Sequence, residues 1–227
     1  MPDKYVIITA GGIGTRMGST APKQFLELEE LPVILHSIKA FIEYLPTIKV
    51  IIVLPENSQM EWNALSKKYG FTSKHRLCTG GDTRFQSVKN GLKLINGNGH
   101  VAIHDAARPL VSVNLIARCF DATGIKGNAI PAISLNDSIR EVVGEENSPV
   151  FRDKYRLIQT PQVFDTKLIQ KAYDQPYRTS FTDDASVAES IGVKINLIEG
   201  EPSNMKLTTQ EDMVMLAALI KQKGVGY

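Results

Sequence analysis

The residues with the clearest chemistry lie near the start of the chain. An apolar run at residues 5–10 leads directly into the glycine-rich segment 11–18 (GGIGTRMG), and Lys23 follows shortly afterwards. Glycine allows backbone N–H groups to approach an anionic ligand closely. Arg16 and Lys23 add positive charge where phosphates would lie. We therefore predict a nucleoside-triphosphate site here, the alternative being a plain glycine turn with two surface cations.

Two common phosphate-binding loops do not match this segment. A P-loop requires Gly-Lys followed by Ser or Thr, and no glycine of the chain is followed by Lys-Ser or Lys-Thr. The dinucleotide motif G-x-G-x-x-G begins at Gly12 and Gly14, but its third glycine position is Met17. The glycine spacing therefore argues against a nicotinamide-linked reductase.

The composition excludes several other classes of protein. The chain has 227 residues, a formal net charge of +2 and 7% aromatic residues, which argues against a nucleic-acid-binding surface. Cys78 and Cys119 have no metal-ligand spacing and indicate buried thiols in a reducing compartment. No apolar run approaches the ~18 residues that span a bilayer, and residues 1–4 do not begin a signal sequence. We expect a cytoplasmic protein that binds neither nucleic acid nor a membrane.

Alternating helix and strand patterns predict a single α/β domain over residues 1–227. Apolar residues recur at helical spacing over 31–45, 58–69 and 84–95. Between these segments lie strand-like runs at 48–54 and 101–104 and a short strand that ends near residue 79. Runs that are apolar on both faces are typical of a buried, mostly parallel sheet flanked by helices, as in Rossmann-like folds. Ligands of such sheets bind beyond the carboxyl ends of the strands. The glycine-rich segment, Gly81 and Asp105 all follow predicted strand ends and should meet there.

Residues 136–159 interrupt this alternation. Polar and apolar residues alternate over 137–143, residues 144–149 are rich in turn formers, and a second strand is expected from 150. We predict a protruding β-hairpin arm. Two strands are barely stable alone, so the arm should pack against a partner subunit in a homodimer. A loosely held surface hairpin is the alternative.

The remaining residues return to the α/β pattern. Helices are expected at 165–174 and 182–191, with a strand at 193–198. The last helix should open with a capping box over residues 208–211. Its apolar residues, including Met213 and Met215, are interpreted as packing. Asp183 and Asp184 are expected to open the preceding helix, where carboxylates complement the helix dipole.

Five segments together carry a resemblance to a known family. They are residues 11–23, GGDTRFQSVKNGL, HDAARP, QTPQ with FTDDAS, and NMKLTTQED. In this order and spacing the chain closely resembles the 2-C-methyl-D-erythritol 4-phosphate cytidylyltransferases of non-mevalonate isoprenoid biosynthesis. The resemblance implies the nucleotide-diphospho-sugar transferase fold. It also implies transfer of CMP from CTP to the polyol phosphate, with release of pyrophosphate.

This reaction requires positive charge more than a proton acceptor. A phosphate monoester has its second pKa near ~6 and is already a dianion at neutral pH. Catalysis must therefore bring two anions together and stabilise the charge that develops on phosphorus. The resemblance assigns that role to Arg16 and Lys23. Asp105 would bind Mg²⁺ or another divalent cation, with a helix N-cap as the alternative, and His104 is expected to be a packed or hydrogen-bonded histidine.

The resemblance also implies the nucleotide contacts. Ser87 would contact the base or ribose, although a serine early in a helix could equally cap it or face water. The main chain around Ala10-Gly11-Gly12 replaces the Ala-Ala-Gly usual in the family. The full predicted set is Ala10, Gly11, Gly12, Gly14, Gly81, Asp82, Ser87 and Ala106.

A third set of residues would hold the acceptor. Lys206, which precedes the last helix, is carried over as a catalytic cation. Ser138, in place of the common threonine, and Arg152 lie on the arm and would act across the dimer interface. The predicted acceptor contacts are Asp105, Arg108, Ser138, Arg152, Thr160 and Thr182.

Two alternative functions stay open at this point. Ribitol-5-phosphate cytidylyltransferases share the first loop and TPQ, whereas HDAARP and TDDAS favour the methylerythritol enzymes. A nucleotide-binding regulator without turnover should have lost a catalytic cation or the metal carboxylate, and Arg16, Lys23, Asp105 and Lys206 are all present.

Overall fold

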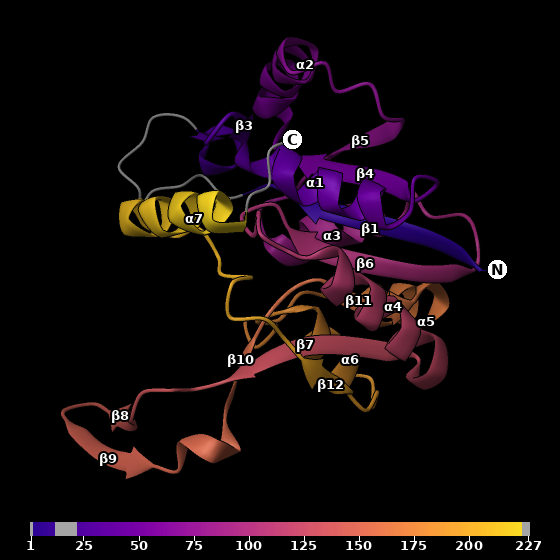
Figure 1. Cartoon of the computed structure of the whole chain (residues 1–227). Helices are drawn as coiled ribbons and strands as arrows, with labels where there is room; N and C mark the ends of the chain where they lie inside the picture. Colours follow the sequence, from indigo (N-terminus) through magenta and orange to yellow (C-terminus); the bar gives the residue numbers. More distant parts are fainter. Residues whose placement is uncertain (1, 12–21, 224–227) are drawn as a thin grey trace.

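The structure is a computed structural model and describes residues 2–11 and 22–223 (Figure 1). Three predicted site residues, Gly12, Gly14 and Arg16, lie outside the described residues.

A central sheet organises the domain and confirms the predicted α/β class. Its strand order is β10-β7-β11-β6-β1-β4-β5, with β12 paired to β7. Strands β6, β1, β4 and β5 run parallel to one another, whereas β11 is antiparallel to both β6 and β7. The bounds are β1 Asp3–Thr9, β4 Lys49–Leu54, β5 His75–Thr79, β6 Gly99–Asp105, β7 Asn128–Ser134, β10 Arg156–Ile158, β11 Gln162–Asp165 and β12 Leu197–Glu199.

Helices cover both faces of this sheet. The bounds are α1 Val33–Tyr44, α2 Gln59–Lys68, α3 Arg84–Leu92, α4 Val113–Lys126, α5 Thr166–Tyr173, α6 Asp184–Glu189 and α7 Gln210–Lys223. The short elements are η2 Lys23–Phe25, η3 Glu56–Ser58, η4 Arg152–Lys154, β2 Glu27–Leu28 and β3 Leu31–Pro32. None of the helices within residues 2–11 and 22–223 has the length and apolar character needed to cross a bilayer.

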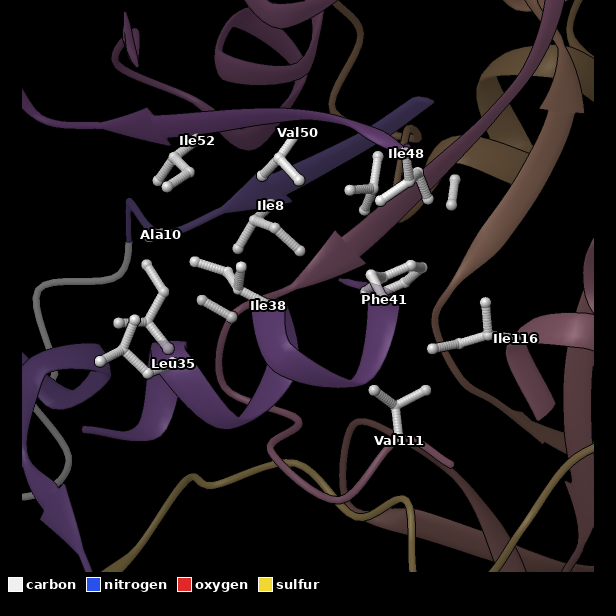
Figure 2. Packing of buried hydrophobic residues seen from close by; sticks show 14 of the residues in the cluster. Ile8, Ala10, Leu35, Ile38, Phe41, Ile48, Val50, Ile52, Val111 and Ile116 are labelled. Carbon is white, nitrogen blue, oxygen red and sulfur yellow. The ribbon is translucent and has the colours of Figure 1, made fainter. Parts of the chain in front are cut away.

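Successive residues of β1 pack into two separate cores. Val6 and Ile8 point to one face, where they join a cluster that includes Phe41 of α1 and Ile116 of α4 (Figure 2). Ile7 points to the other face and joins residues of α3 and α5. Because both faces of the strand are buried, its sequence is a continuous apolar run rather than an alternating one.

The arm extends away from the sheet (Figure 1). Strand β8 (Ile139–Val143) pairs antiparallel with β9 (Glu146–Val150), and Val143 lies opposite Glu146. The prediction that the second strand starts at residue 150 was wrong. The turn needs only two residues, because Gly144 adopts a φ of 62° that suits a tight hairpin. Residues 152–154 then form η4 rather than a strand.

Other boundaries and packing differ from the sequence prediction. Strand β12 starts at Leu197, not 193, and α6 is shorter than expected. Helix α7 is capped one residue later than predicted, because Thr209 Oγ1 accepts from the Asp212 N–H while the Thr209 N–H donates to Asp212 Oδ2. Met215 is exposed and does not pack, whereas Leu216 of the same helix is fully buried.

Candidate active site

A cavity of about 240 Å³ lies at the carboxyl ends of β1 and β6. Residues from five separate segments of the chain line it: Thr9, Ala10, Gly11, Lys23, Gln24, Gly81, Asp82, Thr83, Arg84, Ser87, Asp105, Ala106, Ala107 and Lys206. A larger cavity of about 510 Å³ lies among the amino-terminal halves of β1, β4 and β5 and has no carboxylate in its lining. The smaller cavity is the candidate active site, because it gathers the described residues that carry phosphate chemistry.

Lys23 is held at the edge of this cavity by its neighbours. The side chain of Gln24 is buried and donates to the carbonyl oxygen of Ala10 over 2.8 Å, which fixes η2 against the end of β1. Lys23 Nζ donates to the carbonyl oxygen of Leu207 over 2.9 Å. The ammonium therefore lies between the first strand and the segment that carries Lys206.

Asp105 lies at the end of β6 among several donors. Its Oδ2 accepts from Lys206 Nζ at 2.6 Å, and its Oδ1 accepts from Arg84 Nε at 3.2 Å and Thr9 Oγ1 at 3.3 Å. Burial acts to raise the pKa of Asp105, but the charges of Arg84 and Lys206 outweigh it and hold that pKa well below its usual range. The carboxylate is thus ionised. The N-cap alternative was wrong, because Ser112 caps the next helix.

The structure adds Arg84 and Asp184, which the sequence interpretation missed. Arg84 binds Asp184 through two hydrogen bonds, Nη1 to Oδ1 at 2.8 Å and Nη2 to Oδ2 at 2.7 Å. Asp183 caps α6 as predicted, but Asp184 is fully buried. One signal was present: position 184 shares a helix face with Val187 and Ala188, which are both buried.

The loop after β5 is organised by Ser87. Ser87 Oγ accepts from the Gly81 N–H at 3.1 Å and donates to the carbonyl oxygen of Thr83 at 3.0 Å. Thr83, not Ser87, is the N-cap of α3. The buried Ser87 hydroxyl therefore fixes the Gly81 backbone within the cavity wall, and it neither caps the helix nor faces water.

Ser87→Ala should weaken nucleotide binding more than it slows turnover. The substitution leaves the Gly81 N–H without its acceptor and frees the loop. The bond is only partly buried, and a typical hydrogen bond contributes about 0.5–1.5 kcal/mol. We therefore expect KM for the nucleotide to rise by up to about 10-fold, with a smaller change in kcat. Ser66→Ala is the matched control, because Ser66 Oγ also donates to a carbonyl of its own helix but lies in α2. An unchanged KM in Ser87→Ala would contradict this role.

Thr160 and His104 support Asp105 from behind. Thr160 Oγ1 accepts from the Asp105 N–H at 3.1 Å and lies 3.0 Å from His104 Nδ1. The pKa of His104 is lowered to about 4, chiefly because the ring is buried. His104 also contacts the carbonyl oxygen of Arg108 and the ring of Phe41. His104 is thus a packed, hydrogen-bonded histidine, as predicted.

The other predicted acceptor residues do not line the cavity of this chain. Arg108 donates to the carbonyl oxygens of Asn204 and Ile158 and so braces the segment before Lys206. Thr182 is exposed at the start of α6. Ser138 and Arg152 are exposed on the arm, where Arg152 donates to the carbonyl oxygen of Asn136. A single chain therefore does not bring the predicted acceptor set together.

Comparison with known proteins decides the family. The family model described as IspD, 2-C-methyl-D-erythritol 4-phosphate cytidylyltransferase, matches residues 5–222. The chain belongs to this family. It is accordingly a cytidylyltransferase, a member of the nucleotidyltransferase class of enzymes.

Relatives of this family match in sequence and fold. The 2-C-methyl-D-erythritol 4-phosphate cytidylyltransferase of Bacteroides fragilis is 45% identical over 96% of this chain and 99% of its own length. The 4-diphosphocytidyl-2C-methyl-D-erythritol synthase of Anaerococcus prevotii superposes with a TM-score of 0.82 at 26% identity, covering 97% of this chain and 99% of that one. The bifunctional IspDF of Campylobacter jejuni matches with a TM-score of 0.77 at 34% identity, covering 92% of this chain but 53% of that chain.

Proposed function

We propose that this cytidylyltransferase uses the cavity around Lys23, Asp105 and Lys206 to transfer the cytidylyl group of CTP to 2-C-methyl-D-erythritol 4-phosphate. The products are 4-diphosphocytidyl-2-C-methyl-D-erythritol and pyrophosphate. The observation that carries the proposal is the meeting of two ammonium groups and an ionised carboxylate beside the Gly81 loop. Membership of the family supplies the reaction.

The reaction proceeds by attack of an acceptor phosphate oxygen on the α-phosphorus of CTP. The P–O bond to the β-phosphate breaks, and pyrophosphate leaves with the bonding electron pair. The attacking oxygen is already anionic, so no side chain has to remove a proton. This agrees with the surroundings of His104, which is buried and hydrogen-bonded to Thr160.

Lys23 and Lys206 have different roles in this reaction. Lys23, with Arg16 on the preceding segment, stabilises the negative charge that develops around the α-phosphorus. Lys206 is about 43% exposed and reaches into the cavity from the segment before α7, so it can pair with the acceptor phosphate. Lys206 would then leave Asp105 and bind the acceptor phosphate, so that its ammonium stays paired with an anion throughout.

Asp105 is the residue that would hold a divalent cation. Among the described residues no cluster of three or more His, Cys, Asp or Glu side chains forms a protein-only metal site. Magnesium does not need one, because it binds through one or two carboxylates together with substrate phosphates. The hard, ionised oxygens of Asp105 fit this requirement. When bound, the cation would neutralise charge on the triphosphate.

The arm should complete the site of a second subunit. We propose one domain over residues 1–227 whose arm, residues 136–159, forms a homodimer. Val142, Val143 and Phe151 are 68%, 70% and 80% exposed, an unusual apolar surface for a two-stranded hairpin. Docking the arm on a partner would bury these side chains and bring Ser138 and Arg152 to the partner's acceptor site.

The acceptor is tested by measuring pyrophosphate release from CTP and Mg²⁺ with each polyol phosphate. We expect release with 2-C-methyl-D-erythritol 4-phosphate and a much lower kcat/KM with ribitol 5-phosphate. Release with ribitol 5-phosphate alone would overturn the acceptor assignment. Tight CTP binding without release from either acceptor would instead favour a nucleotide-binding regulator.

A further inference from the structure

We infer that Arg84 is a positioning residue for the transfer reaction, which fixes one oxygen of Asp105 and leaves the other free to change partners. This inference rests on the proposed function of the site. Arg84 is the first residue of α3, directly after the capping residue Thr83. Its guanidinium bridges the Asp105 carboxylate, at the end of β6, and the Asp184 carboxylate in α6.

The guanidinium is anchored by Asp184, which does not line the cavity. Asp184 is fully buried, and both of its oxygens bind Arg84. Tyr173 Oη donates a further hydrogen bond of 2.6 Å to Asp184 Oδ1. A bidentate pair with a third donor fixes the orientation of the guanidinium plane as well as its position. Arg84 Nε is thereby aimed at Asp105.

The anchor is itself held by packed elements. The side chain of Gln162, in β11, donates to Asp183 Oδ2 at 2.8 Å and accepts from the Ala185 N–H at 2.9 Å. The rings of Phe85 and Tyr173 stack with their centroids 4.7 Å apart. The start of α6, the end of α5 and the start of α3 are therefore locked together around one ion pair.

The two oxygens of Asp105 have different partners. Oδ1 accepts from the anchored Arg84 and from Thr9 of β1. Oδ2 accepts from Lys206, whose long side chain is about 43% exposed. When Lys206 turns to the acceptor phosphate, Arg84 remains and keeps the carboxylate charged and aimed. Oδ2 then becomes the oxygen available to a divalent cation. Arg84 would not touch the cation itself but would orient the carboxylate that binds it.

An ion pair that only stabilised the fold would not need this arrangement. The Arg84–Asp184 pair would be complete without the third bond to Asp105. The bond from Arg84 Nε instead connects the Arg84–Asp184 pair to Asp105, the residue proposed to bind the cation. A purely structural role and a positioning role for Arg84 therefore make different predictions. They can be told apart with a variant that keeps the charges of Arg84 and Asp184 but loosens the hold on the guanidinium.

Tyr173→Phe is that variant, because it removes one hydroxyl and leaves Arg84, Asp184 and Asp105 in place. We expect kcat to fall about 10-fold, and the Mn²⁺ concentration that half-saturates the CTP complex to rise by a similar factor, as for other outer residues of metal sites. Arg84→Lys keeps the charge but loses the planar, two-pronged geometry of the guanidinium. It should lower kcat and raise that Mn²⁺ concentration, each by about 10- to 100-fold. Mn²⁺ binding is measured by electron paramagnetic resonance with CTP and without acceptor.

Two controls match these changes. Tyr69→Phe removes a hydroxyl that donates to Glu27 on the surface, and Arg118→Lys alters a guanidinium that binds Glu201 outside the cavity. Neither control should change kcat or Mn²⁺ binding. The inference is overturned when Tyr173→Phe and Arg84→Lys fold normally and match wild type in both measurements. Should Arg84→Lys fail to fold, Tyr173→Phe decides.

The same measurements separate this inference from the proposed function. If the wild-type enzyme releases no pyrophosphate with 2-C-methyl-D-erythritol 4-phosphate, the proposed acceptor is wrong. A weakened Mn²⁺–CTP complex in Tyr173→Phe would still support the role of Arg84, because that readout needs no acceptor.

Discussion

Lys23→Gln is expected to lower kcat by about 100- to 1,000-fold while KM for CTP changes much less. The ammonium acts where charge increases as the α-phosphorus is attacked, so its loss raises the barrier by about 3 to 4 kcal/mol. The rest of the site should survive, because the bond from Gln24 to Ala10 still fixes η2 when the bond from Lys23 to Leu207 is lost. Steady-state pyrophosphate release measures both constants.

The matched control for this prediction is Lys67→Gln. Lys67 is an exposed lysine of α2, and neither it nor α2 lines the cavity. Its substitution removes the same unit of charge without touching the site and should leave kcat unchanged. A Lys23→Gln enzyme that turned over as fast as Lys67→Gln would remove Lys23 from the catalytic machinery.

Arg152→Ala is expected to abolish activity as a pure homodimer and to regain it when mixed with Lys23→Gln. If the arm of one subunit completes the site of the other, a mixed dimer contains one intact site and one site with both defects. Random exchange of subunits in an equal mixture then restores about a quarter of wild-type activity, as follows from the two-fold symmetry. The assay is pyrophosphate release after the two variants have exchanged subunits.

The outcome of mixing separates a shared site from a site within one chain. If Arg152 served its own chain, the mixed dimer would hold two defective sites and no activity would return. Lys154→Ala is the control, because Lys154 is exposed on the same short helix η4 and is not among the predicted contacts. An active monomer in sedimentation analysis would also contradict the shared site.

The sequence predicted those parts of the fold that depend on local pattern. The apolar runs at 48–54 and 101–104 became β4 and β6, because a strand buried on both faces has to be continuously apolar. Motifs at strand ends likewise predicted that the first loop, Gly81 and Asp105 meet, and Gly11, Gly81 and Asp105 line one cavity; Lys206, which the family resemblance supplied, lines it too. Here the topology of a parallel sheet carries residues that are distant in sequence to the same edge.

The sequence failed where contacts between distant segments decide the structure. Arg84 and Asp184 are 100 positions apart, so neither spacing nor composition indicates that they form a bidentate pair. Thr160 was predicted only as an acceptor contact, and the sequence did not indicate that its hydroxyl accepts from the Asp105 N–H. Strand β9 was missed because Asn147, Ser148 and Pro149 resemble turn residues, although only Gly144 and Glu145 form the turn.

The most direct test of the account is the single-turnover rate of pyrophosphate release by an enzyme in which both Arg16 and Lys23 are glutamine. The reaction is run at saturating CTP, Mg²⁺ and 2-C-methyl-D-erythritol 4-phosphate, so that binding is complete and only the transfer step is measured. We expect the rate to fall by at least the factor of about 100 to 1,000 that a single transition-state contact supplies. A rate equal to that of wild type would contradict the claim that fixed positive charge carries this reaction.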